Sequence, residues 1–396
     1  MLDKLREDGV QTYIRKNINE DIPKLALQKS PFPDIPMRII AQQVFGLQKA
    51  KKKLLTWFNK EGILYPPKLN LEQTSSECTA NYKATLIKDN TIADLTGGFG
   101  VDAYFLSKQA SRLDYFEKNE VIYAFAKANF QTFDATTVHC QLGDGIEALK
   151  KANPFYDAIY IDPSRRHDIK GKVFRLEDCE PNVIEHLDFL MQHCSNLWIK
   201  TAPLLDISLG LQALKYVDEL HIVAVKNELK ELLWKVSKKE TATKNPHITV
   251  ANLGLAKSSI LTFQKEQSNQ ETRIYSKPLT YLYEPNAALM KSGAFNWITN
   301  HFQLKKLHPN SHLYTSTTLI DFPGRRFSIN AVYPYAPKQL KKLKIKRANI
   351  TVRNFKETVS QLRKRFTIRD GDDRYLFFTT TTGDKLMVLD CEKVAD

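Results

Sequence analysis

One short glycine-rich segment has residue types and spacing suited to holding a ligand. In ADLTGGFGVDA, residues 93–103, the carboxylate of Asp94 is followed closely by Gly97, Gly98 and Gly100. The overlapping run TIADLT predicts a short buried strand, and VDAYFLSKQ predicts the first turns of a helix. Glycines in a strand-to-helix turn let a ligand approach the backbone where a Cβ would block it. We expect the ligand to be a nucleoside derivative.

Acidic residues also mark the ends of the next three predicted strands. Glu117 ends RLDYFE, Asp144 follows TTVHCQL, and Asp162, with Pro163 after it, ends YDAIYID. In open α/β sheets, ligands bind beyond the carboxyl ends of the strands. A carboxylate such as Glu117 can accept both hydroxyls of a ribose, and Asp144 can accept from an adenine amino group. The four strand ends together predict a pocket for a cationic cofactor.

Parts of this pattern have other interpretations. Gly98 to Ala103 also fits the dinucleotide pattern GxGxxG/A, and Glu117 lies nineteen residues beyond Gly98, so a nicotinamide dehydrogenase is an alternative. That alternative lacks a recognisable catalytic histidine or lysine constellation. Asp94 and Asp144 could also be helix caps, because aspartate is favoured just before a helix. Glu117 could be a surface residue that opens the next helix.

The elements that must position these residues alternate short apolar runs with helical ones. The predicted strands are TIADLT, RLDYFE, TTVHCQL, YDAIYID, NLWIKT and ELHIVAV, with helices between most of them. Such alternation predicts a mainly parallel sheet covered on both faces, a doubly wound α/β core. HITVANL and SSILTFQK are joined by only a short linker, and they predict an antiparallel pair at one edge of the sheet.

Regions of different character flank this core, which is expected over residues 86–270. Residues 1–85 predict an N-terminal helical domain, with an apolar stripe at Ile40, Val44, Leu47, Leu54 and Phe58. Residues 275–396 predict a basic α+β domain. Its expected elements are a helix in NAALMKSGAFNWITNHF, a strand in RFSINAVYP, a basic helix, KIKRANITV, a helix in FKETVSQLRKRF and a hairpin of DRYLFFTTTT and DKLMVLDCE around Gly383-Asp384.

The composition is that of an ordinary soluble globular protein. Of 396 residues, 42% are hydrophobic and 26% charged, and no run of about 18 uncharged apolar residues could cross a bilayer. The N-terminus mixes both charge signs and lacks the apolar centre of a secretory signal, so we expect a cytoplasmic protein. The five cysteines form no CxxC pair and the nine histidines show no ligand spacing. We therefore expect no metal.

Positive charge is concentrated in the predicted C-terminal domain. The net charge of the chain is +14, and between Lys338 and Arg369 twelve basic residues stand against one acidic residue, Glu357. A one-signed field on a folded segment is typical of a surface that binds a polyanion, although a solvated basic face without a partner is the alternative. The residues expected to contact nucleic acid are Lys341, Lys342, Lys346, Arg347, Arg363, Lys364 and Arg365.

Taken in order, the four strand-end motifs resemble those of class I S-adenosylmethionine-dependent methyltransferases. They are D-x-x-x-G-x-G at 94–100, an acidic end to the second strand, D-G after the third and D-P after the fourth. EQTSSECTANYKA, LTGGFGVD, IDPSRR, KNELKELLW and YEPNAALMKSGAF are similar to bacterial methyltransferases that carry a C-terminal THUMP-like domain. The resemblance covers nearly the whole chain. It implies a Rossmann-like methyltransferase sheet with a ferredoxin-like, THUMP-like C-terminal domain.

The resemblance also implies roles for the motif residues. S-adenosyl-L-methionine would be the cofactor, and Asp162, Pro163 and Arg165 would face the methyl group and its acceptor. Structured RNA, such as tRNA or rRNA, would be the substrate, because THUMP-like domains are associated with structured RNA. The residues implied to bind the cofactor are Asp94, Gly97, Gly98, Gly100, Glu117 and Asp144, with Ser75, Ser76, Thr79 and Lys83 at a helix end that closes the pocket.

The acceptor motif departs from the family pattern. Related enzymes that methylate base amino groups carry D/N-P-P-aromatic, whereas residues 162–165 read D-P-S-R. The missing proline and ring put amino-group methylation in doubt, although the plane of Arg165 or Arg166 can stack on a base or hold a phosphate. These arginines could instead pair with Asp168 or Glu177. We expect methyl transfer to an RNA base, and the alternative is an inactive RNA-binding protein on the same fold.

Overall fold

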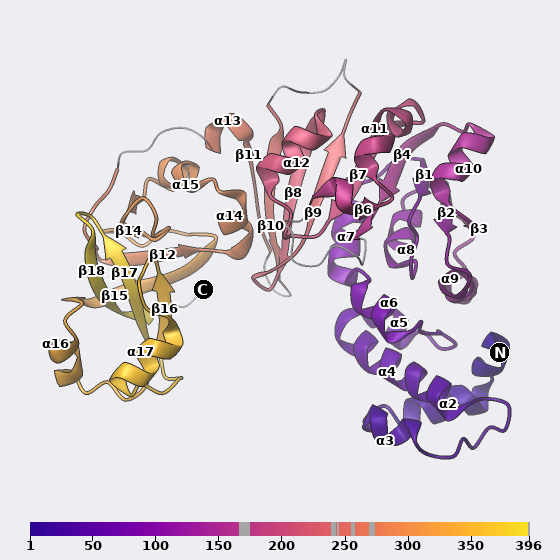
Figure 1. The fold of residues 1–396 in the computed structure, drawn as a ribbon, viewed down its shortest axis with the longest axis horizontal. Coiled ribbons are helices and arrows are strands. Elements are labelled where there is room, and N and C mark those ends of the chain that lie inside the picture. Colours follow the sequence, from indigo (N-terminus) through magenta and orange to yellow (C-terminus); the bar gives the residue numbers. More distant parts are fainter. Residues whose placement is uncertain (166–174, 239–242, 244, 255–257, 269–273, 395–396) are drawn as a thin grey trace. The chain divides into compact units, whose positions relative to one another are not determined.

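The computed structural model describes residues 1–165, 175–238, 243, 245–254, 258–268 and 274–394 (Figure 1). By its internal contacts the chain divides into two compact units, residues 1–225 with 230–244, and residues 226–229 with 245–396. The division into three domains, with boundaries near residues 85 and 270, stays a prediction. Across the described part of the chain, no helix is long and apolar enough to cross a membrane.

The first unit begins with helices that share a core with the sheet. Its apolar stripe is buried in α4, where Ile40, Val44 and Leu47 face the core. Trp57 of α5 packs its ring against Phe99, which belongs to the glycine-rich turn. The helices before the first strand are α1 (Leu2–Leu5), α2 (Asp8–Lys16), α3 (Ile22–Ala26), α4 (Met37–Lys53), α5 (Leu55–Asn59), α6 (Lys68–Gln73) and α7 (Glu77–Leu86).

The central sheet has the strand order β11-β10-β8-β9-β7-β4-β1-β2-β3. Helices α8 (Val101–Ser107) and α9 (Glu120–Thr132) contact β1 to β3, and α11 (Val183–Gln192) contacts β7 (Figure 1). Strands β1, β2, β3, β4 and β7 are parallel, which confirms the mainly parallel α/β core. These strands are β1 (Thr91–Asp94), β2 (Arg112–Glu117), β3 (Val138–Leu142), β4 (Tyr156–Ile161) and β7 (Cys194–Thr201).

The parallel part of the sheet contains a topological switch point. Strands β2 and β3 extend the sheet on one side of β1, whereas β4 and β7 extend it on the other. The connections after β1 and after β4 therefore run in opposite directions and leave a crevice at their carboxyl ends. The helices α10 (Gly145–Ala152) and α12 (Ile207–Leu214) follow β3 and β7.

One strand was not expected from the sequence. Part of the segment KNELKELLW lies in β9 (Glu228–Val236), which runs antiparallel to β7 and lies between β7 and β8 (Val217–Val225). Lys226 and Asn227 make the two-residue turn with positive φ at both positions, the geometry of a tight β-hairpin. The predicted pair HITVANL and SSILTFQK is confirmed as antiparallel β10 (His247–Leu253) and β11 (Ser259–Gln264), at the edge of the sheet.

The second unit contains a sheet of order β13-β14-β12-β15-β18-β17-β16. The predicted C-terminal hairpin is confirmed as β17 (Arg374–Thr381) and β18 (Lys385–Lys393). The other elements are α13 (Lys265–Ser268), β12 (Tyr281–Pro285), α14 (Ala287–Ser292), α15 (Phe295–Phe302), β13 (Lys305–Lys306), β14 (Tyr314–Ser316), β15 (Gly324–Pro334), α16 (Pro337–Lys342), β16 (Asn349–Arg353) and α17 (Val359–Phe366).

The prediction of one helix in NAALMKSGAFNWITNHF was wrong, because two helices occupy this segment. Helix α14 ends at Ser292 and is capped by Gly293, whose φ of 69° is left-handed, and α15 starts at Phe295. A glycine adopts this conformation without the steric cost that a Cβ brings. The apolar residues of this segment therefore keep a helical spacing although the backbone leaves the helical conformation at Gly293.

A buried ion network joins the helices of the first unit to its sheet. Lys83 of α7 is fully buried, and its Nζ lies 2.9 Å from both carboxylate oxygens of Glu231 in β9 and 3.1 Å from Asp102 of α8. Asp102 also accepts from Ser75 at 2.7 Å and from Tyr160 of β4 at 2.8 Å. Burial opposes ionisation of Asp102, but Lys83 and Lys200 outweigh it and lower the pKa of this carboxyl.

We predict that Lys83→Met destabilises the first unit by about 3–5 kcal/mol, because it leaves Glu231 buried without its cation and Asp102 with only the ammonium group of Lys200, 3.9 Å away. Adding Glu231→Leu to Lys83→Met should recover more than half of the loss. The measurement is urea unfolding followed by tryptophan fluorescence, since Trp57, Trp198 and Trp234 lie in this unit.

The matched control is Lys235→Met on the same strand. Lys235 pairs with the partly exposed Glu219, so its loss should cost less than about 1 kcal/mol. A double variant as unstable as Lys83→Met alone would show that the buried ion pair is not the cause.

Candidate functional site

A cavity of about 500 Å³ opens at the carboxyl edge of the sheet, at the switch point between β1 and β4. This volume lies within the range of about 300–1,000 Å³ usual for small-molecule sites. All of the cavity's lining residues belong to the first unit. The structure thus brings the predicted strand ends together in one cavity, whose lining includes Ser75, Asp94, Gly97, Gly98, Glu117, Asp144, Asp162 and Pro163.

The glycine-rich turn is shaped partly by its own neighbours. A Cβ on Gly97 would come within 2.0 Å of the Tyr115 ring, and a Cβ on Gly100 within 2.6 Å of the Phe130 ring. These two glycines are therefore required by internal packing, a role that the sequence analysis did not foresee. Gly98 differs, because it has a φ of 54° and lines the cavity, and a Cβ there would meet nothing closer than the Thr96 carbonyl oxygen at 3.8 Å. Close approach of a ligand is thus best supported at Gly98.

Glu117 and Asp144 hold the backbone around the cavity. Glu117 accepts from the Gly98 amide at 2.9 Å and from the Asn119 amide at 2.7 Å, so it orders the glycine-rich turn directly. Asp144 is the N-cap of α10 and accepts from the Ile146 amide at 2.9 Å. Asp144 therefore does cap a helix, as the alternative interpretation of this residue predicted. Both carboxylates also line the cavity, where they add negative charge.

Asp94 lies deeper than the other carboxylates. Its side chain is 1% exposed, and it accepts from the Thr96 amide at 3.1 Å rather than capping a helix. Burial raises the pKa of Asp94 well above its usual range, and the negative charges of Asp102 and Asp162 add to the effect. A cationic group in the cavity would favour the ionised form of this carboxyl, because opposite charge lowers the pKa of an acid.

The fourth strand places Asp162 at the other side of the cavity. The Asp162 amide donates to Thr96 Oγ1 at 2.7 Å, which fixes the loop after β4 to the loop after β1. Its carboxylate accepts from Lys200 Nζ, and Pro163 is buried beside it. Lys200 ends the apolar run of β7 and also lines the cavity. Lys200 was not among the predicted site residues, although it is the last residue but one of the fifth predicted strand, NLWIKT.

Other predicted site residues lie outside the cavity lining. Ser76 is the N-cap of α7 and accepts from the Thr79 amide at 3.2 Å, so both residues start this helix. Of the four residues predicted at this helix end, Ser75 alone lines the cavity, whereas Lys83 is buried between Asp102 and Glu231. Arg165 lies in the short strand β5 (Ser164–Arg165), which pairs with β6 (Cys179–Glu180). The Arg165 side chain and the whole of Arg166, with its predicted partner Asp168, lie outside the described residues.

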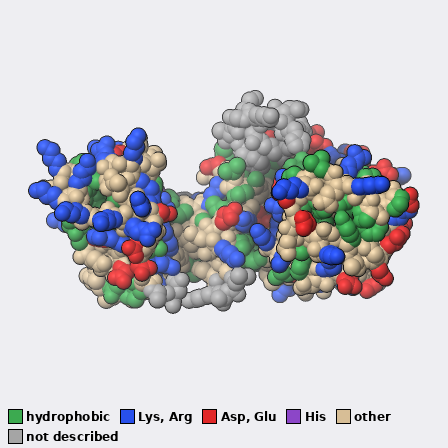
Figure 2. Space-filling model, turned by 90° about the horizontal axis from the view of Figure 1, so that it is seen from below, with side chains coloured by type: hydrophobic (Ala, Val, Ile, Leu, Met, Phe, Trp, Pro, Cys, Tyr) green, Lys and Arg blue, Asp and Glu red, His purple; other side chains and the backbone are tan. Residues whose placement is uncertain are grey.

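The predicted basic surface lies in the second unit. In Figure 2 the lysine and arginine side chains gather over the C-terminal part of the chain, at the left of the view. Two of its members have acidic partners, because Arg363 pairs with Asp370, and Arg365 with Glu357 at 3.0 Å. The remaining predicted contacts are exposed and carry no ion pair with another described residue: Lys341, Lys342, Lys346, Arg347 and Lys364.

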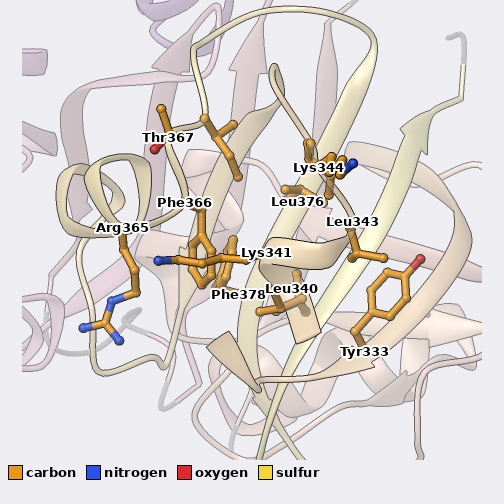
Figure 3. A pocket seen from close by; sticks show the side chains of 13 residues that line it. Tyr333, Leu340, Lys341, Leu343, Lys344, Arg365, Phe366, Thr367, Leu376 and Phe378 are labelled. Atoms are coloured by element: carbon orange, nitrogen blue, oxygen red, sulfur yellow. The ribbon is translucent and has the colours of Figure 1, made fainter. Parts of the chain in front are cut away.

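A second cavity, of about 290 Å³, opens within this basic surface. Most of its lining residues are apolar, and the rings of Phe366 and Phe378 lie roughly parallel with centroids 6.2 Å apart. Lys341 and Lys344 also line it, whereas the head of Arg365 turns away from the two rings (Figure 3). The surface therefore combines positive charge with an apolar hollow.

Comparisons with known proteins agree with this architecture. Residues 281–323 match a family described as a ferredoxin-like domain, and residues 324–393 match one described as THUMP domain-like. A search of the curated proteins finds no match to the sequence. Among solved structures, a candidate methyltransferase from Porphyromonas gingivalis W83 is 31% identical, with a TM-score of 0.88 and 98% of each chain covered.

More distant structures cover only part of the chain. TrmK from M. capricolum, solved with S-adenosyl-homocysteine, is 17% identical over 41% of this chain and 68% of its own, with a TM-score of 0.32. The tRNA (m1A58) methyltransferase TrmI from Aquifex aeolicus is 14% identical over 42% of this chain and 71% of its own, with a TM-score of 0.31. TM-scores this low give no support to a shared activity. The full-length match, the two domain matches and the sheet topology show that the chain belongs to the class I S-adenosylmethionine-dependent methyltransferase family with a C-terminal THUMP-like domain.

Proposed function

We propose that this protein is an S-adenosylmethionine-dependent methyltransferase that transfers a methyl group to a base of structured RNA, such as tRNA or rRNA. The observation that carries the proposal is the single cavity at the switch point of the sheet, lined by Asp94, Glu117, Asp144 and Asp162. Ligands of open α/β sheets bind at this place, and carboxylates suit a ligand with a positive charge.

The residues around the cavity fit S-adenosylmethionine. A Cβ on Gly98 would meet only the Thr96 carbonyl oxygen, at 3.8 Å, and a Cβ on Gly143 would meet nothing within 4 Å, so the backbone can lie close to the ligand. In our proposal Glu117 holds the ribose hydroxyls, Asp144 the adenine amino group, and Asp94 with the glycine-rich turn the methionine part. Ser75 adds a hydroxyl at the edge of the cavity. The bound cofactor supplies an electrophilic methyl group.

The chain's own residues position the acceptor. Asp162 and Pro163 lie beyond β4, on the far side of β1 from Glu117 and Asp144. A base entering from this side would meet the Asp162 carboxylate, which can accept a proton or a hydrogen bond. Most of the catalytic benefit would come from holding acceptor and methyl group at reacting distance. Arg165 and Arg166 remain proposed contacts to the base or its phosphate.

The basic surface of the second unit supports RNA as the substrate. Its exposed lysines and arginines can contact phosphates, and the apolar cavity between them can accept part of an unpaired nucleotide. Because phosphate contacts release counterions, such binding weakens steeply with salt. The THUMP-like match over residues 324–393 favours RNA among the polyanions that this charge could bind.

The proposed activity is tested by incubating the protein with tritium-labelled S-adenosylmethionine and total RNA from cells in which the gene has been deleted. We expect label in the RNA, and we expect less label when the RNA comes from cells that retain the gene. RNA that binds the protein but gains no label would instead indicate an inactive RNA-binding protein on the methyltransferase fold.

We predict that Glu117→Ala weakens binding of S-adenosyl-homocysteine by about 10- to 100-fold, because charge-assisted hydrogen bonds contribute about 1.5–3 kcal/mol. Isothermal titration calorimetry measures this affinity. The matched control is Glu120→Ala, since Glu120 is an exposed first-turn residue of α9 that does not line the cavity. RNA affinity should stay within twofold in both variants, and an equal loss of RNA affinity in Glu117→Ala would contradict separate cofactor and RNA sites.

We predict that replacing Lys341, Lys342, Lys346 and Arg347 with alanine reduces the salt dependence of RNA binding. Each lost phosphate contact should make the slope of log affinity against log salt shallower by about 0.7–0.9, so the total change should be about 3. The matched control replaces Lys24, Lys29, Lys51 and Lys52, four exposed lysines among residues 1–85. If the two variants had the same slope of log affinity against log salt, the four replaced C-terminal residues would not contact RNA phosphates.

A further inference from the structure

Asp162 and Lys200 lie side by side at the carboxyl edge of the sheet. Ile161 of β4 is the parallel partner of Ile199 of β7, so the residue that follows each of them reaches the same edge. Lys200 Nζ donates to the Asp162 carboxylate and, at 3.2 Å, to Ser75 Oγ. Both side chains line the 500 Å³ cavity. We call Asp162 and Lys200 the donor–acceptor pair.

Each member of the donor–acceptor pair keeps hydrogen-bonding capacity for a ligand. An ammonium group has three N–H donors, and Lys200 uses two of them on Asp162 and Ser75. Asp102 Oδ2 lies 3.9 Å from Lys200 Nζ, too far for a hydrogen bond. The Asp162 side chain is 35% exposed, and Lys200 binds its Oδ2. Among the described residues, no donor bonds to Oδ1 of Asp162, which can therefore accept from a ligand.

Lys200 is held in its charged form. Burial by itself would lower the pKa of Lys200, but Asp162, Asp102 and Glu231 outweigh burial and raise the pKa above its usual range. Lys200 therefore acts as a donor and a fixed positive charge rather than as a base. The group of the pair that can accept a proton is the carboxylate of Asp162.

The location of the donor–acceptor pair makes it part of the acceptor side of the cavity. Glu117 and Asp144 lie at the ends of β2 and β3, on one side of β1, whereas the pair lies at the ends of β4 and β7, on the other. If the nucleoside of the cofactor occupies the first side, as proposed above, the RNA base meets the pair. The inference below rests on that proposed function.

We propose that the donor–acceptor pair selects a base by an N–H that lies next to a carbonyl, as N1–H and O6 of guanine or N3–H and O4 of uracil do. Asp162 accepts the N–H, and Lys200 donates to the neighbouring carbonyl oxygen. Attack by an amino group would instead build positive charge on the nitrogen, which the nearby ammonium group opposes. Selection of a ring N–H rather than an amino group also agrees with residues 162–165, which lack the second proline and the aromatic ring of enzymes that methylate amino groups.

The transfer step then balances in atoms and charge. The N–H proton passes to Asp162 Oδ1, and the electron pair of that bond forms the new bond from nitrogen to the methyl carbon. The carbon–sulfur bond breaks and its electron pair stays on sulfur, which becomes a neutral thioether. Negative charge that develops on the carbonyl oxygen faces Lys200, as a preorganised donor faces an oxyanion. Asp162 afterwards releases the proton to water.

The test identifies the methylated nucleoside. RNA from cells in which the gene has been deleted is methylated by the full-length protein, digested, and analysed by mass spectrometry against standards. Methyl groups on N1 of guanosine or N3 of a uridine would support the proposal. Methylation of an amino group, of adenine N1, of carbon or of ribose would overturn it while leaving the proposed function intact. Absence of any RNA methylation would overturn both.

Two variants test the role of Lys200 independently of the product. Lys200→Met should lower kcat about 100-fold at neutral pH, with the rate recovering as pH rises and the base N–H ionises without assistance. Lys200→Arg, which keeps the charge, should retain most of the rate. S-adenosyl-homocysteine affinity by calorimetry should stay within threefold in both, which shows that the cavity is folded. If kcat of Lys200→Met depended on pH in the same way as kcat of the wild type, the proposed role of Lys200 would be contradicted.

Discussion

The buried cation of Lys83 is the constraint on which the candidate site depends. It lies between Asp102 and Glu231, so one ammonium group ties α7, α8 and β9 together. Taking charges out of water is costly, and the cost is offset only when each charge meets its partners at close range. Ser75 and Tyr160 complete the partners of Asp102. The positions of the glycine-rich turn, of the helix that follows it and of β4 are thereby coupled.

This network continues into the cavity through Lys200. Ser75 accepts from both Lys83 and Lys200, and Lys200 in turn binds Asp162. The side of the cavity formed by β4 and β7 is therefore rich in paired charge, whereas the side formed by β1 to β3 carries carboxylates whose contacts are mostly backbone amides. The carboxylates on the side of β1 to β3 suit a cofactor with a positive charge. Lys200 on the side of β4 and β7 suits an acceptor on which negative charge develops.

Much of the fold could be predicted because its signals are local. Strand runs such as RLDYFE and YDAIYID have apolar residues at the positions that the sheet buries, and the structure has strands at both. Two elements were mispredicted for physical reasons. The strand β9 follows a turn of Lys226 and Asn227, which lacks the usual Asn-Gly signal. The break at Gly293 left the apolar pattern of the surrounding helices unchanged.

By itself, the sequence determined that acidic residues follow successive strands and that the C-terminal part is strongly basic. Parallel strands bring their carboxyl ends to one edge, so Asp94, Glu117, Asp144 and Asp162 had to lie near one another once the strands were recognised. Only the tertiary structure decided which groups pair across the edge. Lys200 is 38 residues from Asp162, and Lys83 is 148 residues from Glu231. Such contacts depend on sheet order and burial, which no local pattern of residues records.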